Sequence, residues 1–456
     1  MVERWNPSTY LLHMTFRRFF GAKDAPKPQV QNDPTAVPEA TEEVEEAAEE
    51  AIPEEHDAAD WQTRARAVLP TGASTGSKRT EALYGDADAS GPTHYVQAIG
   101  CRVTDADGNE YIDCSMALGS VALGYAEPNV TRAVVDAIAA GNVSGLSSVL
   151  EVDVAERLCG VIPCADRVQF LKTGAEAVAA AVRLARTYTA RELVIAVGYF
   201  GWLDWCAEEA AGVPEGTRRT IRRVPYDDIA ALQAAVDEAG QQLAAIVIEP
   251  VIERLPSIEW ITKARELTTA VGAALIFDEI KTGFRVRTGG YQAYADVVPD
   301  LAAFGKAMAN GYPLAAVVGH RDIMEAARKT WISSTLASEA SALAAAAAVL
   351  AWHDSVDVCD SLWTIGADMR RAISAAIEAS GVDGVTVDGI DPMWLLRFDD
   401  PLKERRFLEL SAEHGVLFKR RAYNFAALAH DEDAIREIEG GASAAFVDLR
   451  DEDADR

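Results

Sequence analysis

A chain of 456 residues exceeds the roughly 250–300 residues at which a single hydrophobic core stops growing, so two lobes are expected. The 71 acidic residues outnumber the 43 basic ones, and the formal net charge of -28 argues against nucleic acid and anionic membranes as partners. Six cysteines without a CxxC pair predict buried thiols in a reducing compartment, with no metal site and no disulfide framework. No apolar run approaches the ~18 residues of a membrane-spanning helix and no cleavable leader is recognisable, so a cytoplasmic protein is expected.

Residues 1–60 are predicted to be a disordered acidic extension. From Ala25 to about Asp60 the chain is rich in Pro, Glu and Ala, and "EATEEVEEAAEEAIPEE" has too few large apolar groups to fold alone. Ahead of it, "YLLHMTFRRFFGAK" (residues 10–23) mixes aromatic residues with arginines. Two interpretations stay open for this segment: a short amphipathic helix that docks on a partner, and a frayed terminus.

From about Trp61 the pattern is typical of an α/β protein. A hairpin is predicted in "CRVTDADGNEYIDC", with Asp107 and Gly108 in the turn. Continuous apolar runs then alternate with Ala-rich helical runs, which indicates a mostly parallel sheet covered by helices on both faces. The expected strands are "RVQFL", "ELVIAV", "AAIVIEP", "AALIFDE" and "LAAVVGH", and the expected helices include "AEAVAAAVRLART" and "SIEWITKARELTTAVG".

The pattern changes towards the C-terminus. After the helical "ASEASALAAAAAVLAWH" and "LWTIGADMRRAISAAIEAS", two strand-like segments, "MWLLRFD" and "GVLFKR", flank the helical "LKERRFLELSAEH". This mixture predicts a smaller α+β domain. We therefore expect the extension at 1–60, an N-terminal part of the small domain at 61–125, a large domain at 126–355 and the C-terminal part of the small domain at 356–456.

One lysine stands alone in an apolar stretch. In "PDLAAFGKAMANGYPLAAVVGH", Lys306 is the one charged residue between Leu301 and Val318. A buried stem with its amine at the surface is the ordinary interpretation of such a lysine. In "AALIFDEIKTGFR", however, Asp278 ends an apolar strand at its carboxyl end, the edge of an open α/β sheet where ligands bind. A helix cap or a loop ion pair is the alternative interpretation of that carboxylate.

Two further segments complete a pattern of four groups. "QFLKTGAEAV" predicts a strand, a tight turn at Thr173 and Gly174, and a helix whose free N–H groups suit a phosphate. "GYFGWLDW" places Tyr199 and Phe200 just after a strand, where an aromatic face can cover a planar ligand or simply pack in the core. An amine, a carboxylate, a phosphate-binding helix end and a stacking aromatic are together what pyridoxal 5'-phosphate (PLP) requires.

These motifs resemble the class III aminotransferases, PLP-dependent enzymes of fold type I, and among them the branch that contains glutamate-1-semialdehyde aminomutase. The resemblance runs from about Gly91 to His430. "LKTGAEAV" is similar to the family's phosphate-binding turn, "LIFDEIKTGFR" to its strand with the pyridine partner, and "DLAAFGKAMANGYPLAAVVG" to its Schiff-base segment. The resemblance implies a large PLP-binding domain with a seven-stranded, mostly parallel sheet, and a smaller α+β domain formed by the N- and C-terminal segments.

The resemblance also implies roles for single residues. Lys306 is similar to the Schiff-base lysine and Asp278 to the partner of the pyridine nitrogen, which makes these two the expected catalytic residues. Tyr199 is similar to the aromatic residue that stacks on one ring face, and Ile280 to the apolar residue behind the other. The remaining implied cofactor contacts are Thr173, Gly174 and Ala175, together with Thr335, which is expected to reach the phosphate of the neighbouring subunit in a homodimer.

The sequence departs from the family pattern at several positions. Phe200 stands where a His is usual, Leu203 where a second His is frequent, and Ala175 where a Thr is common. These departures leave the substrate open. Arg285 is either a contact for a substrate carboxylate or part of a structural ion pair, and Glu339 is a candidate contact for the amino group of a donor.

The expected activity is transamination with ping-pong kinetics, from an amine or amino-acid donor to an aldehyde or ketone acceptor. The segment between Tyr199 and "IVIEPV" is shorter than the mobile loop region of the aminomutase, which favours this interpretation. Two alternatives stay open. One is an aminomutase-like intramolecular transfer of the amine, and the other is a catalytically silent PLP-binding scaffold recruited through its N-terminal tail.

Overall fold

The computed structural model describes residues 58–209 and 211–454. The predictions for residues 1–57, namely the acidic extension and the segment at 10–23, lie outside the described residues. The described chain begins with α2 (Ala58–Val68), followed by α3 (Thr80–Tyr84).

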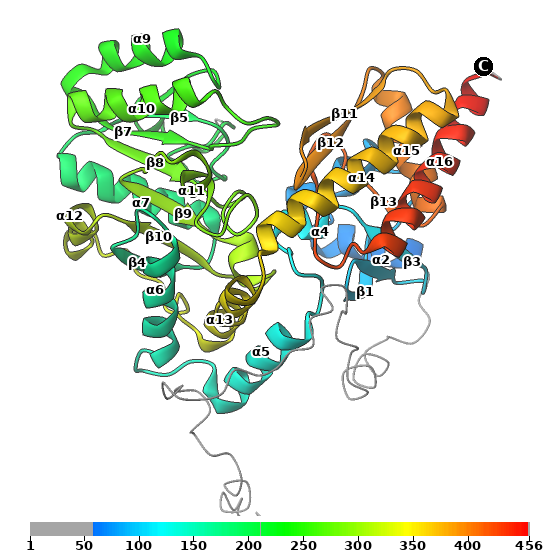
Figure 1. Ribbon diagram of the computed structural model, residues 1–456, viewed down its shortest axis with the longest axis horizontal. Helices are drawn as coiled ribbons and strands as arrows, with labels where there is room; N and C mark the ends of the chain where they lie inside the picture. Colours follow the sequence, from blue (N-terminus) through cyan, green and yellow to red (C-terminus); the bar gives the residue numbers. More distant parts are fainter. Residues whose placement is uncertain (1–57, 210, 455–456) are drawn as a thin grey trace, which may run out of the picture. The chain divides into compact units, whose positions relative to one another are not determined.

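The large sheet has seven strands in the order β4–β10–β9–β8–β7–β5–β6 (Figure 1). β10 runs antiparallel to both of its neighbours, β4 and β9, whereas the other four described pairs are parallel. The predicted mostly parallel, seven-stranded sheet is therefore confirmed. Its strands are β4 (Arg167–Leu171), β5 (Leu193–Val197), β6 (Ile221–Arg223), β7 (Leu243–Ile248), β8 (Ala274–Asp278), β9 (Leu301–Phe304) and β10 (Ala315–Gly319).

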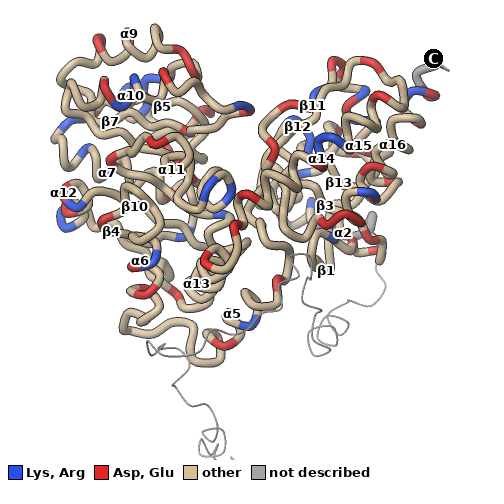
Figure 2. Tube along the Cα trace, in the orientation of Figure 1, with Lys and Arg blue, Asp and Glu red and all other residues tan. Residues whose placement is uncertain are grey.

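Both faces of this sheet are covered, which explains its apolar strands. Alternate residues of a strand enter different cores: Ile246 and Ile248 pack in one, and Ala245 and Val247 in the other. α7 (Gly174–Thr189) covers one face, and α6 (Val149–Val161) and α10 (Ile258–Val271) cover the opposite face. Figure 2 shows the middle of the sheet almost free of charged residues. Within the described residues of β5, β7, β8, β9 and β10, the one charged residue is Asp278.

The other helices around this sheet connect its strands or lead away from it. α13 packs in the same core as α6 and α10, and α14 follows it after a sharp bend. The bounds are α5 (Pro128–Gly141), α8 (Glu215–Arg218), α9 (Ile229–Ala239), α11 (Tyr291–Ala295), the 3-10 helix η5 (Lys306–Ala309), α12 (Arg321–Met324), η6 (Glu325–Lys329), α13 (Ala340–Ser355) and α14 (Val358–Ser380).

Of the two smaller sheets, the four-stranded one combines strands from the two ends of the described chain, and the three-stranded one uses only strands between residues 385 and 425. β13 (Val416–Leu417) pairs in parallel with β3 (Glu110–Asp113), which forms the predicted hairpin with β2 (Arg102–Asp105). Gly108 in the hairpin turn has a φ of +85°, a conformation that favours glycine. The remaining elements are β1 (Tyr95–Ile99), α4 (Met116–Gly119), β11 (Val385–Ile390), β12 (Met393–Phe398), α15 (Pro401–Glu413), β14 (Asn424–Phe425), α16 (Glu432–Ala454) and the 3-10 helices η3 (Gly76–Lys78) and η4 (Gly240–Gln242).

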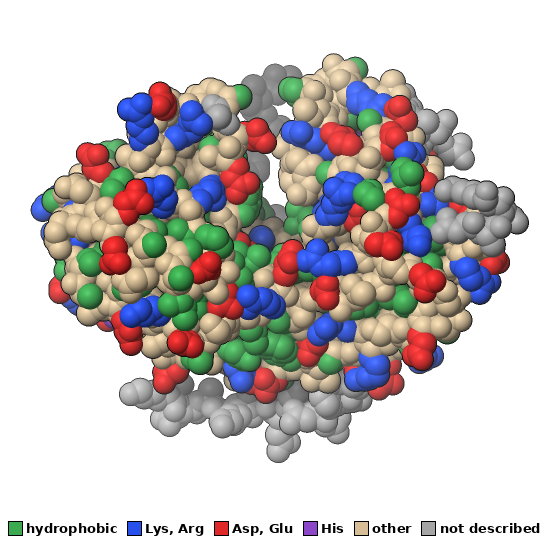
Figure 3. Space-filling view, turned by 90° about the horizontal axis from the view of Figure 1, so that it is seen from above, with side chains coloured by type: hydrophobic (Ala, Val, Ile, Leu, Met, Phe, Trp, Pro, Cys, Tyr) green, Lys and Arg blue, Asp and Glu red, His purple; other side chains and the backbone are tan. Residues whose placement is uncertain are grey.

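Among the described residues, no single helix has both the length and the apolar composition that crossing a membrane requires. α13 and α14 reach that length and composition only as a pair, and they meet at an angle of 81°. On the face shown in Figure 3, acidic and basic side chains are interspersed, with apolar side chains between them.

Candidate active site

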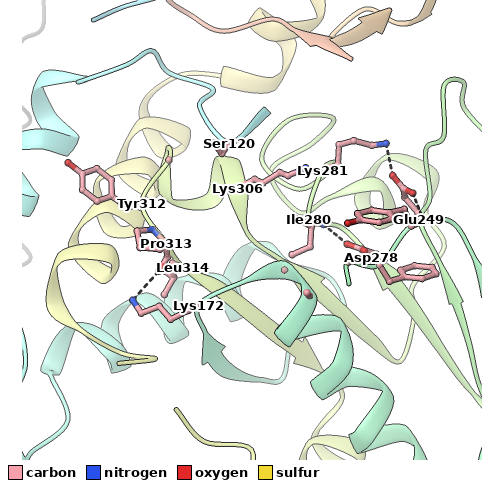
Figure 4. A pocket seen from close by; sticks show the side chains of 16 residues that line it. Ser120, Lys172, Glu249, Asp278, Ile280, Lys281, Lys306, Tyr312, Pro313 and Leu314 are labelled. Atoms are coloured by element: carbon pink, nitrogen blue, oxygen red, sulfur yellow. Dashed lines mark hydrogen bonds and ion pairs between the residues drawn. The ribbon is translucent and has the colours of Figure 1, made fainter. Parts of the chain in front are cut away.

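A pocket of about 360 Å³ lies at the carboxyl ends of the central parallel strands (Figure 4). Glu249 follows β7, Asp278 ends β8, and Lys306 comes two residues after β9. Because parallel strands end at one sheet edge, these three side chains meet there, and the cavity volume is in the range of small-molecule sites. The pocket is lined by Ser120, Lys172, Gly174, Ala175, Tyr199, Phe200, Gly201, Glu249, Asp278, Ile280, Lys281, Lys306, Gly311, Tyr312, Pro313 and Leu314.

Lys306 brings its amine into this pocket at the start of η5. Its φ of +49° is in the left-handed region, which non-glycine residues seldom occupy and which is enriched at functional sites. Burial, and then the nearby Lys281 cation, lower the pKa of Lys306 to about 8. At this pKa on the order of a tenth of the amine is neutral and nucleophilic at pH 7, far more than for a lysine at its usual value of 10.5.

Asp278 is the buried acid of the site, with only 6% of its surface exposed. Its Oδ1 accepts a hydrogen bond from the Ile280 N–H at 3.0 Å. Burial, and then the neighbouring Glu249 carboxylate, raise the pKa of Asp278 to about 7. A cationic group in the pocket would offset that unfavourable environment, and a protonated pyridine nitrogen is such a group.

The predicted phosphate turn is built around a capping box. The Thr173 hydroxyl accepts from the Glu176 N–H at 3.2 Å, and the Glu176 carboxylate accepts from the Thr173 N–H at 2.9 Å. Thr173 thus caps α7 and does not line the pocket. The first N–H groups of the helix, those of Gly174 and Ala175, have no intrahelical acceptor and suit an anion. A Cβ on Gly174 would lie 3.0 Å from side-chain carbons of Ile280, so glycine permits this close packing.

The two neighbouring aromatic residues Tyr199 and Phe200 lie in different environments. Tyr199 lines the pocket, is 64% exposed, and its N–H donates to the Glu249 carboxylate at 3.1 Å. Phe200 touches the pocket but is only 2% exposed and packs on Trp205 with ring centroids 5.8 Å apart. The phenylalanine at the family's usual His position is therefore mainly a core residue.

Three other residues that were singled out from the sequence do not line this pocket. Thr335 is exposed between η6 and α13, outside this pocket, and its contact across a subunit interface stays a prediction. Arg285 is fully buried, does not line this pocket, and forms no ion pair with the residues that the structure describes. Its guanidinium donates instead to the backbone carbonyls of Gly119, Val121, Pro392 and Ala426. The Glu339 carboxylate forms an ion pair with the Lys172 amine at 2.7 Å and caps the start of α13.

An ion pair in the pocket wall was not predicted from the sequence. The Lys281 amine lies 2.5 Å from the Glu249 carboxylate, and both side chains line the pocket. Glu249 could have been recognised from the sequence. "IVIEP" places an acid at the end of one apolar strand, as "LIFDE" does at the end of the next, and both strands end at the same sheet edge. Ser120 and Tyr312 were also missed, since they lie in loops without a recognisable pattern.

The side chains present fit PLP chemically. They supply a nucleophilic amine at Lys306, a buried acid for a basic ring nitrogen at Asp278, and free N–H groups for a phosphate at the start of α7. Ile280 and Tyr199 provide an apolar and an aromatic surface beside these groups.

The family model "Aminotransferase class-III" matches residues 84–430. A 2'-deamino-2'-hydroxyneamine transaminase from Streptomyces kanamyceticus is 34% identical over 372 residues, which cover 80% of this chain and 93% of the transaminase. A glutamate-1-semialdehyde 2,1-aminomutase from Methanosarcina acetivorans is 32% identical over 379 residues, which cover 75% of this chain and 89% of the aminomutase.

Solved structures show the same fold. The FumI protein of Sphingopyxis sp. MTA144, solved in a PLP-containing form, superposes with a TM-score of 0.82 at 26% identity and covers 87% of this chain and 97% of its own. A glutamate-1-semialdehyde aminomutase from Pseudomonas aeruginosa PAO1 superposes with a TM-score of 0.75 at 21% identity, covering 89% of this chain and 96% of its own. The second likeness supports the fold alone.

Proposed function

Because the chain belongs to the class-III aminotransferases and is a PLP-dependent enzyme of fold type I, we propose that it moves an amino group between two different substrates. The donor is an amine or amino acid, and the acceptor is a separate aldehyde or ketone. The proposal rests on one observation: Lys306 and Asp278 line the same pocket, together with the first residues of α7.

The proposed roles follow from the chemistry of each group. PLP, when bound, withdraws electrons from the carbon that carries the amine. The Lys306 amine would hold the cofactor covalently and would be the base that moves a proton at the reacting carbon. The Asp278 carboxylate would keep a basic ring nitrogen protonated. The Gly174 and Ala175 N–H groups would bind a phosphate, and Tyr199 and Ile280 would offer an aromatic and an apolar surface to the ring.

The first experiment is an absorbance spectrum of the purified protein with PLP, taken before and after adding a panel of amino donors. We expect a band at roughly 410–430 nm, and we expect borohydride to attach the cofactor to Lys306, detectable as added mass. Lys306→Ala should give neither. A wild-type protein without the band would contradict the proposal and favour the silent scaffold.

The same preparation separates transamination from intramolecular transfer. The similarity to glutamate-1-semialdehyde aminomutases supports this second candidate. A transaminase needs a donor and an acceptor, and one donor alone converts the bound cofactor to its amine form. An aminomutase turns over glutamate-1-semialdehyde with no added acceptor, so steady turnover of that single substrate would replace our proposal by the alternative.

Three further predictions extend the proposal. We propose a homodimer in which Thr335 of each subunit reaches the other subunit's phosphate. The division into a large domain at 126–355 and a small domain formed by 61–125 and 356–456 is proposed from the sequence pattern. A cytoplasmic location is proposed from the cysteine pattern, and the six cysteines of the described chain are free.

A further inference from the structure

The pocket contains a second buried lysine that the proposed chemistry does not use. Lys281 lies three residues after β8, and its side chain is only 9% exposed. Lys281 and Lys306 both line the pocket, and Figure 4 shows them on the same side, with Lys281 reaching to Glu249. Two amines enclosed in one small cavity repel each other when both are charged, so the surroundings must determine which one holds a proton.

The contacts of Lys281 stabilise its cation. Its amine lies 2.5 Å from the Glu249 carboxylate and 4.1 Å from the centre of the Tyr423 ring, over which it is placed for a cation–π interaction. Tyr423 is itself fixed, because its hydroxyl accepts from the Glu253 N–H at 2.7 Å. Burial by itself would lower the pKa of Lys281, but Glu249 and Tyr423 raise it above its usual value.

The environment of Lys306 has the opposite effect. The charged groups that act on it are Lys281, Asp278, Glu249 and Arg285. After burial, the Lys281 cation is the largest influence, and it lowers the proton affinity of Lys306 despite the two acids. The surroundings therefore raise the pKa of Lys281 and lower the pKa of Lys306. Active sites use such differences to give different roles to residues of the same type.

We propose that Lys281 is a positioning residue whose fixed cation disfavours protonation of the nitrogen of Lys306. The same ion pair holds the second oxygen of Glu249 on the Tyr199 N–H, at 3.1 Å, and so fixes the segment that carries the aromatic ring. This inference rests on the proposed function, since it concerns the nitrogen through which Lys306 holds PLP.

The test is a pH titration of the absorbance of PLP bound to the full chain, which reports protonation at the Lys306 nitrogen. In Lys281→Met we expect the midpoint to move upward by on the order of one pH unit, because a neighbouring positive charge is lost. Lys281→Arg keeps a charge and should restore most of the wild-type midpoint. Lys263→Met, which removes a lysine on α10 outside the pocket, should leave the midpoint unchanged.

A double variant distinguishes charge from damage to the structure. Lys281→Met with Glu249→Gln removes both members of the ion pair, so the midpoint should return towards the wild-type value. A double variant displaced as far as the single one, or no displacement in Lys281→Met, would overturn the inference. If wild-type protein forms no borohydride-reducible band at all, the proposed function fails instead, so the two failures are distinguishable.

Discussion

At the scale of single residues, Asp278 carries the clearest consequence for stability. Its pKa is raised from 3.8 to about 7 in the folded protein without cofactor, so the folded state binds more protons than the unfolded state between these values. Stability is therefore lost as the pH rises from about 4 through 7. We expect Asp278→Asn to stabilise the cofactor-free protein at pH 8 by roughly 2–4 kcal/mol, and by much less at pH 4.

The measurement is thermal or denaturant unfolding of cofactor-free wild type and Asp278→Asn from pH 4 to pH 9. PLP should reverse the order, because the wild-type carboxylate gains a cationic partner that the amide cannot replace. A stability difference that does not change with pH would show that Asp278 has an ordinary pKa.

The same residue shows what the sequence reveals at this scale. A charge in an otherwise apolar run is conspicuous, so Asp278 and Lys306 could be identified from the sequence alone. Lys281 could not be given a role, because it stands in a loop where a charged side chain is unremarkable. Its significance comes from Glu249 and Tyr423, which are 32 and 142 residues away in the chain.

At the scale of elements, α7 depends on the capping box at its start. Thr173→Ala removes the hydroxyl that accepts the Glu176 N–H, and we expect the free energy of unfolding to fall by about 1 kcal/mol. PLP affinity should change little, because the N–H groups of Gly174 and Ala175 remain free. Thr173→Ser keeps the cap and serves as the control for equilibrium unfolding and PLP titration. A roughly tenfold loss of PLP affinity with unchanged stability would instead make the Thr173 hydroxyl a phosphate ligand.

Elements with strong periodicity could be predicted almost to their ends, and most strands run parallel as expected, but the antiparallel direction of β10 could not be predicted. "RVQFL" coincides with β4, and "AEAVAAAVRLART" lies within α7. β9 was not anticipated, since four residues, "LAAF", are too short to signal a strand. The antiparallel direction of β10 depends on how the chain turns after Lys306. Only two residues of "GVLFKR", Val416 and Leu417, pair with β3, so the strand is shorter than the apolar run.

At the scale of the whole molecule, two buried polar residues connect the pocket with distant segments. Asn310 accepts from the N–H groups of Ala122 and Leu123 at 2.9 and 3.0 Å and donates to the Gly124 carbonyl. Arg285 binds carbonyls from both ends of the described chain. The loop after Lys306 is thereby fixed against the segment that carries Ser120.

Large apolar side chains are exposed on α5, on α6 and in the segments before α6 and α13. Leu146 is 84% exposed in the loop between α5 and α6, and Trp331 is 90% exposed before α13. The two segments are joined where the Ala340 N–H donates to the Asn142 carbonyl at 2.8 Å. So many exposed large apolar side chains indicate a surface that another protein chain covers. The exposed large apolar residues of these segments are Val135, Ile138, Val143, Leu146, Val149, Val152, Trp331 and Leu336.

We expect this surface to form the proposed dimer. Light scattering should give twice the mass of the chain for wild type, and Leu146→Asp should give a monomer, because it places an unpaired charge in the interface. Since Thr335 would then no longer reach a second phosphate, the monomer should also bind PLP more weakly. Leu402→Asp changes an apolar residue on α15 that is 67% exposed and lies outside this group; it is the control and should stay dimeric. Thr335→Ala should keep the dimer mass and lose only PLP affinity, whereas a wild-type monomer with tight PLP binding would disprove the shared site.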